Sequence, residues 1–332
     1  MKALSLFSGG LDSILSVKLI MEQGIEIIAL HFDTGFGGYK HQEKLEYLQK
    51  ITSQIGVKLE IIDIKEQFVK DILFNPKYGY GKNFNPCIDC HANMFSWALK
   101  LLDKYGASFV ISGEVVGQRP MSQRFDALKK VSDLAGSEDL ILRPLSAKLL
   151  PPTLPEREGW VERNKLLDIQ GRSRKVQMEL AKEWGITQYE TPAGGCLLTD
   201  PHFGKKMKDI AKFDISGFDI TDIPLLKTGR HFRLPDGAKL IIGREEKENN
   251  FLLKAKTDKY LKITLLDIIG PDGLIYKTAT DQEIMLAARI ILTYAKHPYA
   301  EKEYKVEIEN YGILSISPFN SKKETQKYLI GS

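Results

Sequence analysis

The residues best suited to chemistry near the start of the chain are Ser8-Gly9-Gly10-Leu11-Asp12-Ser13. Residues 3–7 before them are nearly all apolar, as expected of a parallel strand covered on both faces. Residues 14–21 after them carry apolar side chains at helical spacing. A Gly-Gly turn between a strand and a helix directs backbone N–H groups and the positive end of the helix dipole at one small volume. The segment therefore predicts a phosphate-binding loop, although a glycine turn followed by a helix cap has the same pattern. It is not a Walker A loop, because no Gly-Lys-Ser/Thr follows.

The chain has three cysteines, Cys87, Cys90 and Cys196. The C-x-x-C spacing at the start of a helix puts two thiols on one side, near a positive dipole end that favours thiolate. Four interpretations are open: incidental core cysteines, a zinc site completed by His91 or His202, a catalytic pair, or an iron–sulfur cluster. In the catalytic pair, Cys196 would carry a persulfide and Cys90 would resolve it as a disulfide. In the cluster, all three thiolates would bind a 4Fe–4S centre whose fourth iron is open to hold sulfur.

Composition predicts a two-domain globular protein of the cytoplasm. The chain has 332 residues, of which 43% are hydrophobic and 27% charged, and these values are ordinary for soluble proteins. Its apolar runs are too short to span a bilayer, and Met1-Lys2 leads directly into the first strand without a signal-peptide layout. We therefore expect no membrane partner. A net charge of +4 does not by itself indicate nucleic acid, but twelve Lys and Arg residues between 119 and 175 suit either a phosphate-tracking patch or a solvated surface.

Strand and helix patterns alternate through the first part of the chain. Strands are predicted at 3–7, 25–32, 58–64 and 107–112, and helices at 14–21, 41–55, 65–74 and 93–105. Repeated βα units predict an α/β fold with a doubly wound parallel sheet, whose ligands collect at the carboxyl ends of the strands. Ser8–Ser13, Asp33-Thr34-Gly35 and Gly113-Glu114 all follow predicted strands. We expect these three segments to converge on one nucleotide.

The second part of the chain has a different character. Residues 143–155 are rich in proline and predict an ordered connection, followed by helices at 160–169 and 173–184. Beyond residue 228, strands at 239–242, 260–266 and 274–277, a helix at 281–296 and a hairpin at 305–308 and 313–316 predict a smaller α+β domain. We expect an ATP-binding domain at 1–185, a connecting segment at 186–228 that carries Cys196, and an RNA-binding α+β domain at 229–332.

The Ser-Gly-Gly-x-Asp-Ser segment resembles the signature of the PP-loop ATP pyrophosphatases. Those proteins bind ATP and cleave it between the α and β phosphates, which leaves an adenylated intermediate. The resemblance implies bound ATP and Mg²⁺, with Asp12 as a magnesium ligand or loop-orienting group. It assigns nucleotide binding to the loop and the neighbouring strand ends: Ser8, Gly9, Gly10, Asp12, Ser13, His31, Phe32, Asp33 and Gly113.

Asn85-Pro86-Cys87-Ile88-Asp89-Cys90-His91 resembles the Asn-Pro-Cys-x-x-Cys-Asn segment of tRNA 2-thiouridylases. In that family a second cysteine lies far downstream, where this chain has Cys196. The chain departs from the family pattern at His91 and in residues 113–120, and both departures bear on the target nucleotide rather than on the chemistry. The arrangement of three cysteines also resembles cluster-dependent tRNA thiolases. We favour the cluster, because Cys87 has no task in a two-cysteine mechanism.

The segment 243–250, Gly-Arg-Glu-Glu-Lys-Glu-Asn-Asn, resembles the Gly-Arg-Asn-x-x-x-Asn segment of the RNA-binding domain in NFACT proteins, and Ala287-Ala288 in the long helix fits that domain. A turn and helix cap would have the same pattern. Basic and aromatic residues surround it and favour RNA binding: Arg230, His231, Arg233, Lys254, Lys256 and Tyr260.

Together these features predict ATP-dependent thiolation of a uridine or cytidine in tRNA. Cys90, Cys196 and Asp12 would be catalytic, Cys87, Cys90 and Cys196 would bind the cluster, and a cysteine desulfurase, a sulfur carrier or sulfide would donate sulfur. One alternative is a PP-loop ligase or amidotransferase that adenylates a carboxylate and binds zinc at its cysteines. A second is an RNA-binding protein that uses ATP only as a ligand.

Overall fold

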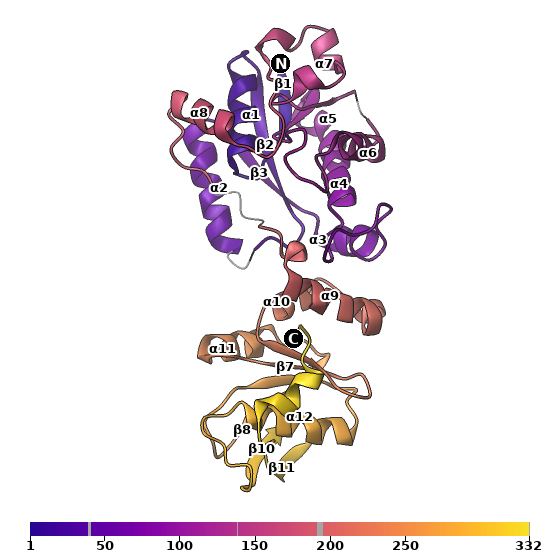
Figure 1. Ribbon diagram of the computed structural model, residues 1–332, viewed down its shortest axis with the longest axis vertical. Coiled ribbons are helices and arrows are strands. Elements are labelled where there is room, and N and C mark those ends of the chain that lie inside the picture. Colours follow the sequence, from indigo (N-terminus) through magenta and orange to yellow (C-terminus); the bar gives the residue numbers. More distant parts are fainter. Residues whose placement is uncertain (39–40, 138, 191–194, 332) are drawn as a thin grey trace. The chain divides into compact units, whose positions relative to one another are not determined.

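The computed structural model describes residues 1–38, 41–137, 139–190 and 195–331. The chain divides into two compact units, Met1–Leu197 and Leu198–Ser332, each of which has its own sheet and core (Figure 1). Residues 198–228 belong to the second unit. No helix among the described residues is long and apolar enough to cross a membrane.

The first unit is built on a five-stranded parallel sheet of order β3-β2-β1-β4-β5. Its strands are β1 (Lys2–Leu6), β2 (Glu26–Asp33), β3 (Lys58–Asp63), β4 (Phe109–Ser112) and β5 (Ile141–Leu142). The chain leaves β1 in one direction and later crosses back to place β4 on its other side. The predicted doubly wound parallel sheet is therefore confirmed, and the carboxyl ends of β1, β2 and β4 lie together at one edge.

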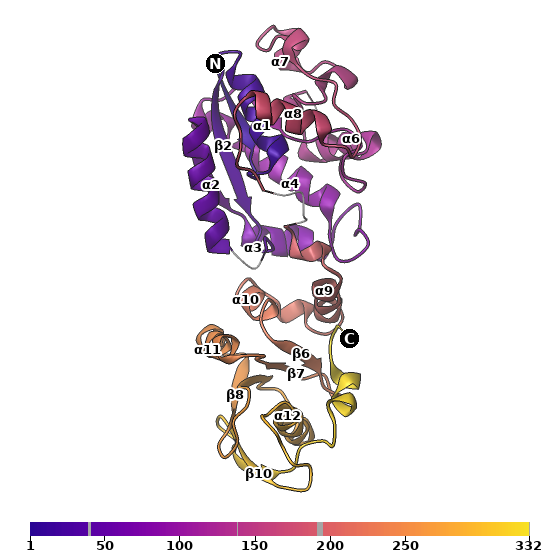
Figure 2. The ribbon, with the colours of Figure 1, turned by 60° about the vertical axis from the view of Figure 1, so that its left-hand side comes forward.

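Helices cover both faces of this sheet (Figure 2). They are α1 (Leu11–Met21), α2 (His41–Ile55), α3 (Lys65–Phe68), α4 (Cys87–Lys100), α5 (Leu102–Tyr105), α6 (Phe125–Ala135), α7 (Leu154–Arg157) and α8 (Lys175–Glu183). Alternate strand residues face opposite layers, since Ala3 packs with α1, α2 and α8, whereas Leu4 packs with α4 and α6. Burial on both faces explains the nearly continuous apolar strands.

Several sequence expectations for the first unit differ from the structure. The helix predicted at 160–169 is an irregular segment with a 3-10 turn at Arg163–Lys165. Its backbone instead bonds to the proline-rich connection, because Leu167 N–H donates to Pro144 O and Ile169 N–H donates to Leu145 O. The helix predicted at 93–105 begins earlier, at Cys87, and is interrupted at Leu101. The helix predicted at 65–74 continues beyond Phe68 as a π-helical turn, Val69–Leu73. Helix α6 has no counterpart in the prediction.

The second unit contains a six-stranded antiparallel sheet of order β11-β10-β8-β9-β7-β6. Its strands are β6 (Arg230–Arg233), β7 (Lys239–Ile242), β8 (Tyr260–Leu265), β9 (Gly273–Tyr276), β10 (Tyr304–Ile308) and β11 (Gly312–Ile316). Its helices are α9 (Pro201–Phe213), α10 (Asp222–Leu226), α11 (Glu246–Ala255) and α12 (Asp281–Thr293), and a 3-10 helix spans Lys322–Tyr328. The apolar side of α12 packs on one face of the sheet, and α10 and α11 pack on the other. The predicted α+β character of this part is confirmed.

Candidate active site at the carboxyl edge of the parallel sheet

The segment from Ser8 to Ser13 is a tight turn between β1 and α1. Gly9 has a φ of +74°, and a Cβ there would lie 2.8 Å from the side chains of Tyr47 and Leu48. Ser13 Oγ donates to Gly10 O at 2.8 Å, and Ser8 Oγ lies 3.4 Å from Ser13 Oγ. The two hydroxyls therefore meet at the amino end of α1, where backbone amides and the helix dipole favour an anion.

Asp12, in the first turn of α1, is buried and joins three segments of the chain. Its Oδ2 accepts hydrogen bonds from Gln118 Nε2 at 2.6 Å and from Arg174 NH2 at 3.1 Å. Gln177 Nε2 in turn donates to Gln118 Oε1 at 3.0 Å. The other carboxylate oxygen, Oδ1, is buried and has no hydrogen-bond partner among the described residues. One oxygen thus orients the loop, and the other is a hard oxygen ligand of the kind that Mg²⁺ prefers.

Helix α2 holds the carbonyl side of the loop. Tyr47 Oη donates to Gly9 O at 2.6 Å, and Lys44 Nζ donates to Ser8 O at 2.6 Å and to Glu190 at 2.5 Å. Burial and the nearby Glu190 carboxylate raise the pKa of Tyr47 to about 12, so its hydroxyl stays a donor. The carbonyls of Ser8 and Gly9 are thus bound on the α2 side of the loop, while Gly10 N–H donates to Ser8 Oγ and Ser13 N–H donates to Gly10 O within it. Sequence reasoning missed Lys44, Tyr47 and Glu190, although Lys44 and Tyr47 share a helix face at i,i+3 spacing.

The end of β2 has a structural role that the sequence did not reveal. Asp33 Oδ1 accepts from Gly35 N–H at 2.8 Å, and its Oδ2 accepts from Lys65 Nζ at 2.9 Å. His31 Nδ1 lies 3.2 Å from Phe7 O, and Phe32 packs in the core. These residues reach the expected edge, but the described contacts of Asp33 shape the loop that follows it.

The end of β4 lies directly against the start of α1. A Cβ at Gly113 would stand 2.5 Å from Asp12 C and from Ser13 N, closer than any real side chain tolerates. Glycine is therefore required for the phosphate loop to approach β4. The next residue, Glu114, is buried and begins the connection from this loop to the cysteines.

Glu114 links the end of β4 to α4 and β5. Its Oε1 lies 2.8 Å from His91 Nδ1, and its Oε2 accepts from Arg143 Nε at 2.9 Å. Burial alone would raise the pKa of Glu114, but the Arg143 charge and the bond with His91 outweigh burial and lower it to about 2. His91, next in sequence to Cys90, is thus held by the strand end that also contacts the phosphate loop.

The three cysteines converge at the same edge. Cys87 and Cys90 lie in the first turn of α4, and Cys196 is exposed in a short bridge with Gly37, just beyond β2. Leu197 N–H donates to Phe36 O at 2.9 Å and secures that bridge. Burial raises the pKa of Cys90 well above its ordinary value, and the charges of Cys196 and Cys87 raise it further. Cys87 and Cys196 are therefore both near enough to Cys90 to act on its titration.

The sequence predicts that the C-x-x-C thiols are readily deprotonated, but in the structure the pKa of both is raised. Burial also raises the pKa of Cys87, although the Asn85 amide, which donates to Cys87 Sγ at 3.1 Å, and Arg119 lower it in part. Desolvation outweighs the helix amino end at both positions. In the resting protein we expect Cys87 and Cys90 to be thiols.

The predicted metal ligands are only partly brought together. In the ranges that the structure describes, no three His, Cys, Asp or Glu side chains form a group that could hold a metal ion as they stand. His91 Nδ1 is engaged with Glu114, and His202 lies on α9 of the second unit, where its Nδ1 is 3.1 Å from Gly331 O. The cysteines converge as sulfur donors, but without a fourth protein ligand beside them they do not form a ready-made zinc site.

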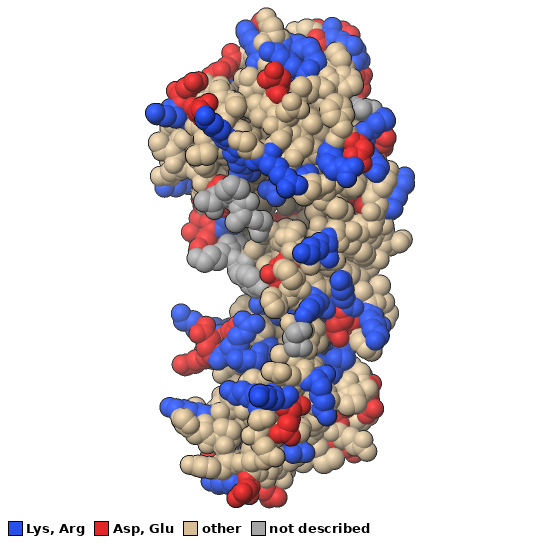
Figure 3. Space-filling view, viewed as in Figure 1, with Lys and Arg blue, Asp and Glu red and all other residues tan. Residues whose placement is uncertain are grey.

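Basic residues between 119 and 175 are mostly committed to acidic partners. The described ion pairs join Arg124 and Lys130 to Asp126, Lys129 to Asp133, Arg143 to Glu114, Arg157 to Asp139, Arg163 to Glu156, Lys165 to Glu162 and Arg174 to Asp12. The face drawn in Figure 3 likewise shows Lys and Arg interspersed with Asp and Glu. This favours a solvated surface over an unbroken phosphate-tracking patch.

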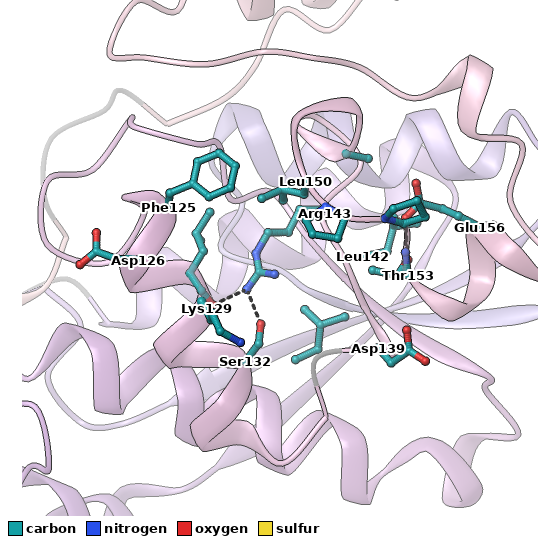
Figure 4. Close-up of a pocket in the computed structure, with 15 residues that line it drawn as sticks. Phe125, Asp126, Lys129, Ser132, Asp139, Leu142, Arg143, Leu150, Thr153 and Glu156 are labelled. Atoms are coloured by element: carbon teal, nitrogen blue, oxygen red, sulfur yellow. Dashed lines mark hydrogen bonds between the residues drawn. The ribbon is translucent and has the colours of Figure 1, made fainter.

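A cavity of about 580 Å³ in the first unit has no residue of the phosphate loop in its lining. It opens between α6 and the connection at 147–156, and its lining is mainly apolar (Figure 4). Arg143 crosses it and donates to Ser132 Oγ at 3.1 Å. Neither a cysteine nor a residue of the phosphate loop is among the residues that line this cavity, so it is not the site of the chemistry considered above.

Two families match separate parts of the chain. Residues 1–148 match the family described as thiamine biosynthesis protein (ThiI), and residues 229–329 match the NFACT protein RNA binding domain. The first unit thus carries a PP-loop domain of the ThiI type, and the second carries an NFACT RNA-binding domain. The PP-loop and NFACT resemblances drawn from the sequence motifs are confirmed.

Curated relatives match the first unit. The tRNA-specific 2-thiouridylase MnmA of Campylobacter fetus subsp. fetus is 30% identical over 159 residues, which are 46% of this chain and 44% of that protein. A probable tRNA sulfurtransferase of Thermococcus kodakarensis is 32% identical over 149 residues, 43% of this chain and 36% of that protein. The chain thus matches less than half the length of these relatives.

Among solved structures, a 4-thiouridine synthetase–RNA complex with bound ATP aligns with a TM-score of 0.39 and 20% identity, over 68% of this chain and 52% of that one. The U34-tRNA thiolase NcsA from Methanococcus maripaludis with its 4Fe–4S cluster aligns with a TM-score of 0.37 and 16% identity, over 65% and 70%. Scores this low transfer no ligand to this chain.

Proposed function

We propose that the chain is an ATP-dependent tRNA thiolase, which activates a base carbonyl with ATP and replaces its oxygen with sulfur. One observation carries the proposal: the phosphate loop and the three cysteines lie at the same edge of one sheet. Gly113 packs on the loop and the adjacent Glu114 holds His91, which follows Cys90. The names of the relatives, which describe sulfur transfer to tRNA, support the same reaction.

Activation is the task of the loop from Ser8 to Ser13. The carbonyl oxygen of the base attacks the α-phosphorus of ATP, a P–O bond to the β-phosphate breaks, and pyrophosphate leaves with that electron pair. The loop amides and the Ser8 and Ser13 hydroxyls stabilise the charge on the phosphate oxygens. Asp12 Oδ1 would bind Mg²⁺, which supplies further charge neutralisation, while Asp12 Oδ2 keeps the loop oriented through Gln118 and Arg174.

Sulfur transfer is the task of Cys196 and Cys90. Cys196 is exposed, so its thiolate can attack the terminal sulfur of a persulfide on a donor protein. The S–S bond of the donor breaks, the donor cysteine leaves as a thiolate, and Cys196 carries the persulfide. The terminal persulfide sulfur attacks the activated carbon, and AMP leaves with the original carbonyl oxygen. Cys90 then loses its proton to solvent and attacks Cys196 Sγ. A Cys90–Cys196 disulfide forms, the thiolated base is released, and a dithiol reductant restores both thiols.

A 4Fe–4S cluster is the second candidate for the sulfur-handling group, favoured by the position of Cys87. Cys87 lies close enough to act on Cys90, and a disulfide relay leaves it without a task. The three thiols fit a cluster in donor type, but they would have to move closer together to hold it, because as they stand no such group of three forms among the described residues. Cys87, Cys90 and Cys196 would hold it, and it would supply an iron with a free position for sulfur. No step above depends on it.

Substitution of the exposed cysteine tests the proposal. Purified Cys196→Ser should lose thiolation of unmodified tRNA but still release pyrophosphate from ATP and leave AMP attached to the base of that tRNA, because activation precedes sulfur transfer. Ser315→Ala, an exposed change in the second unit, is the control and should thiolate normally. Full thiolation by Cys196→Ser would overturn the assigned role. Absorbance near 400 nm in anaerobically purified protein, with matching iron, would favour the cluster over the disulfide relay.

A further inference from the structure

A cavity of about 260 Å³ in the second unit is lined by an unusual number of basic side chains. Lys206 comes from α9, and Arg230 and Arg244 come from the sheet and from the turn after β7. His202 and His231 also line it, and the remaining walls are Gly229 and residues 329–331. Lys206 and His202 precede the part of the chain that matches the NFACT domain, so the cavity joins that domain to α9.

Lys206 is a buried cation in the lining of this cavity. It is 9% exposed, and its Nζ donates to the carbonyl oxygen of Leu226 at 2.8 Å. Burial, together with the positive charges of Arg244 and Lys239, lowers its pKa to about 7. A buried ammonium that has a carbonyl partner but no ion pair with a carboxylate among the described residues is costly to the fold. An anion in the cavity would compensate that charge.

Arg244 is held toward the cavity by glycines. Its NH2 donates to Gly229 O at 3.1 Å. Gly229 has a φ of +73°, and a Cβ there would lie 2.5 Å from Ile242 O. A Cβ at Gly243 would collide with the Asn249 side chain, which explains why a glycine precedes Arg244. Glu248, 3.7 Å from Arg244 NH1, is the one carboxylate paired with these cations among the described ion pairs.

His231 adds a different kind of group. It is 1% exposed, and its Nε2 donates to Thr228 O at 2.8 Å. Burial and the neighbouring lysines lower its pKa well below its ordinary value, so the ring is neutral. Nδ1 is then an acceptor, and it has no hydrogen-bond partner among the described residues. The cavity therefore offers several cationic donors and one acceptor that suits a hydroxyl group.

We propose that this cavity binds one phosphate group of RNA, with Lys206, Arg230 and Arg244 around the phosphate and His231 Nδ1 accepting from a neighbouring ribose hydroxyl. Arginine and lysine donors are the usual partners of phosphate oxygens, and a 2′-hydroxyl is the group that distinguishes RNA from DNA. The proposal rests on tRNA being the substrate. It adds a contact made by the second unit, independent of ATP and of the cysteines.

Binding of a fluorescent tRNA transcript to the full chain, without ATP, tests the site by anisotropy at several salt concentrations. Lys206→Met and Arg244→Gln remove the cations, and Lys208→Met removes an exposed lysine from the same helix as a matched control. We expect Lys206→Met to weaken binding by about tenfold or more. It should also reduce the slope of log K against log salt by about 0.7 to 0.9, the share of one phosphate contact. Lys208→Met should change the affinity by less than about twofold.

Two further measurements distinguish a failure of the phosphate-site proposal from a failure of the thiolase proposal. Inorganic phosphate should raise the melting temperature of the wild type and of Lys208→Met more than that of Lys206→Met. The wild type should also bind a DNA of the same sequence more weakly than the RNA, and His231→Phe should reduce that difference. Equal tRNA affinity and equal salt slopes for Lys206→Met and Lys208→Met would overturn the phosphate site while leaving the thiolase proposal intact. If the wild type binds no tRNA, both proposals fail.

Discussion

The connection between the phosphate loop and the cysteines depends on Glu114, and Glu114→Gln is its sharpest perturbation. The substitution keeps the shape of the side chain but removes its charge. Arg143, which is 6% exposed and pairs with Glu114 at 2.9 Å, would be left buried without its counterion. Removing one partner of a buried pair typically costs about 3 to 5 kcal/mol. We expect a loss in the lower part of that range, because Ser132 Oγ and Leu128 O also accept from Arg143.

The pH dependence of the unfolding free energy gives a second, independent value for the contribution of the Glu114 charge. The pKa of Glu114 is lowered from 4.5 to about 2 in the folded state, so its charge stabilises the fold fully above the unfolded pKa. That stabilisation is lost as the pH falls from about 4.5 toward 2. A difference of about 2.5 pKa units corresponds to roughly 3 kcal/mol. The wild type should therefore lose about 2 kcal/mol more than Glu114→Gln between pH 7 and pH 3.

The assay is tryptophan fluorescence during urea unfolding. The three tryptophans of the chain, Trp97, Trp160 and Trp184, all lie in the first unit, so their fluorescence reports the unfolding of that unit alone. Glu158→Gln, an exposed change in the same unit, is the control and should unfold like the wild type. Equal stability of Glu114→Gln and the wild type at pH 7, or parallel stability curves down to pH 3, would refute the role given to this pair.

Two other substitutions probe the two units separately. Gly113→Ala should abolish measurable ATP binding in calorimetry, because its Cβ would stand 2.5 Å from the backbone of Asp12 and Ser13; an unchanged ATP affinity would contradict the close approach. Lys206→Met should make the second unit more stable than in the wild type at pH 6. The pKa of Lys206 is about 7 in the folded state and 10.5 ordinarily, so at pH 6 the wild type buries a charge that costs on the order of a few kcal/mol. Lys206 is neutral in both the folded and the unfolded wild type by pH 11. The extra unfolding free energy of Lys206→Met should therefore shrink as the pH rises from 7 to 11, which urea unfolding followed by circular dichroism measures. An advantage that does not change with pH would contradict a buried charge.

Local patterns were enough to predict the sheet and the position of the phosphate loop. Burial on both faces leaves an apolar strand, and a Gly-Gly turn between such a strand and a helix is typical of a phosphate loop, so β1 and the turn at 8–13 could be predicted. The segments 8–13, 33–35 and 113–114 could be grouped because the carboxyl ends of parallel strands share an edge, whereas the three cysteines were grouped through the resemblance to tRNA thiolases. The same reasoning failed at 160–169, where backbone bonds to Pro144 and Leu145 replace a helix.

The contacts that organise the site could not be predicted, because they join residues far apart in the sequence. Asp12 meets Arg174, Glu114 meets Arg143, and Lys44 meets Glu190. Each is an ordinary charged residue until the fold brings its partner close. The thiol pKa values were misjudged for a related reason: burial at Cys90 depends on the surrounding fold, whereas the helix amino end is visible in the sequence.

The most direct test of the central claim is to incubate the purified protein with unmodified tRNA, ATP and a persulfide-generating cysteine desulfurase, and to measure AMP and the tRNA nucleosides by mass spectrometry in the same samples. We predict one thiolated nucleoside for each AMP formed, and neither product when tRNA is omitted. AMP formation without any thiolated nucleoside would contradict the account and favour a ligase. Retained tRNA binding with neither product would indicate a binding protein.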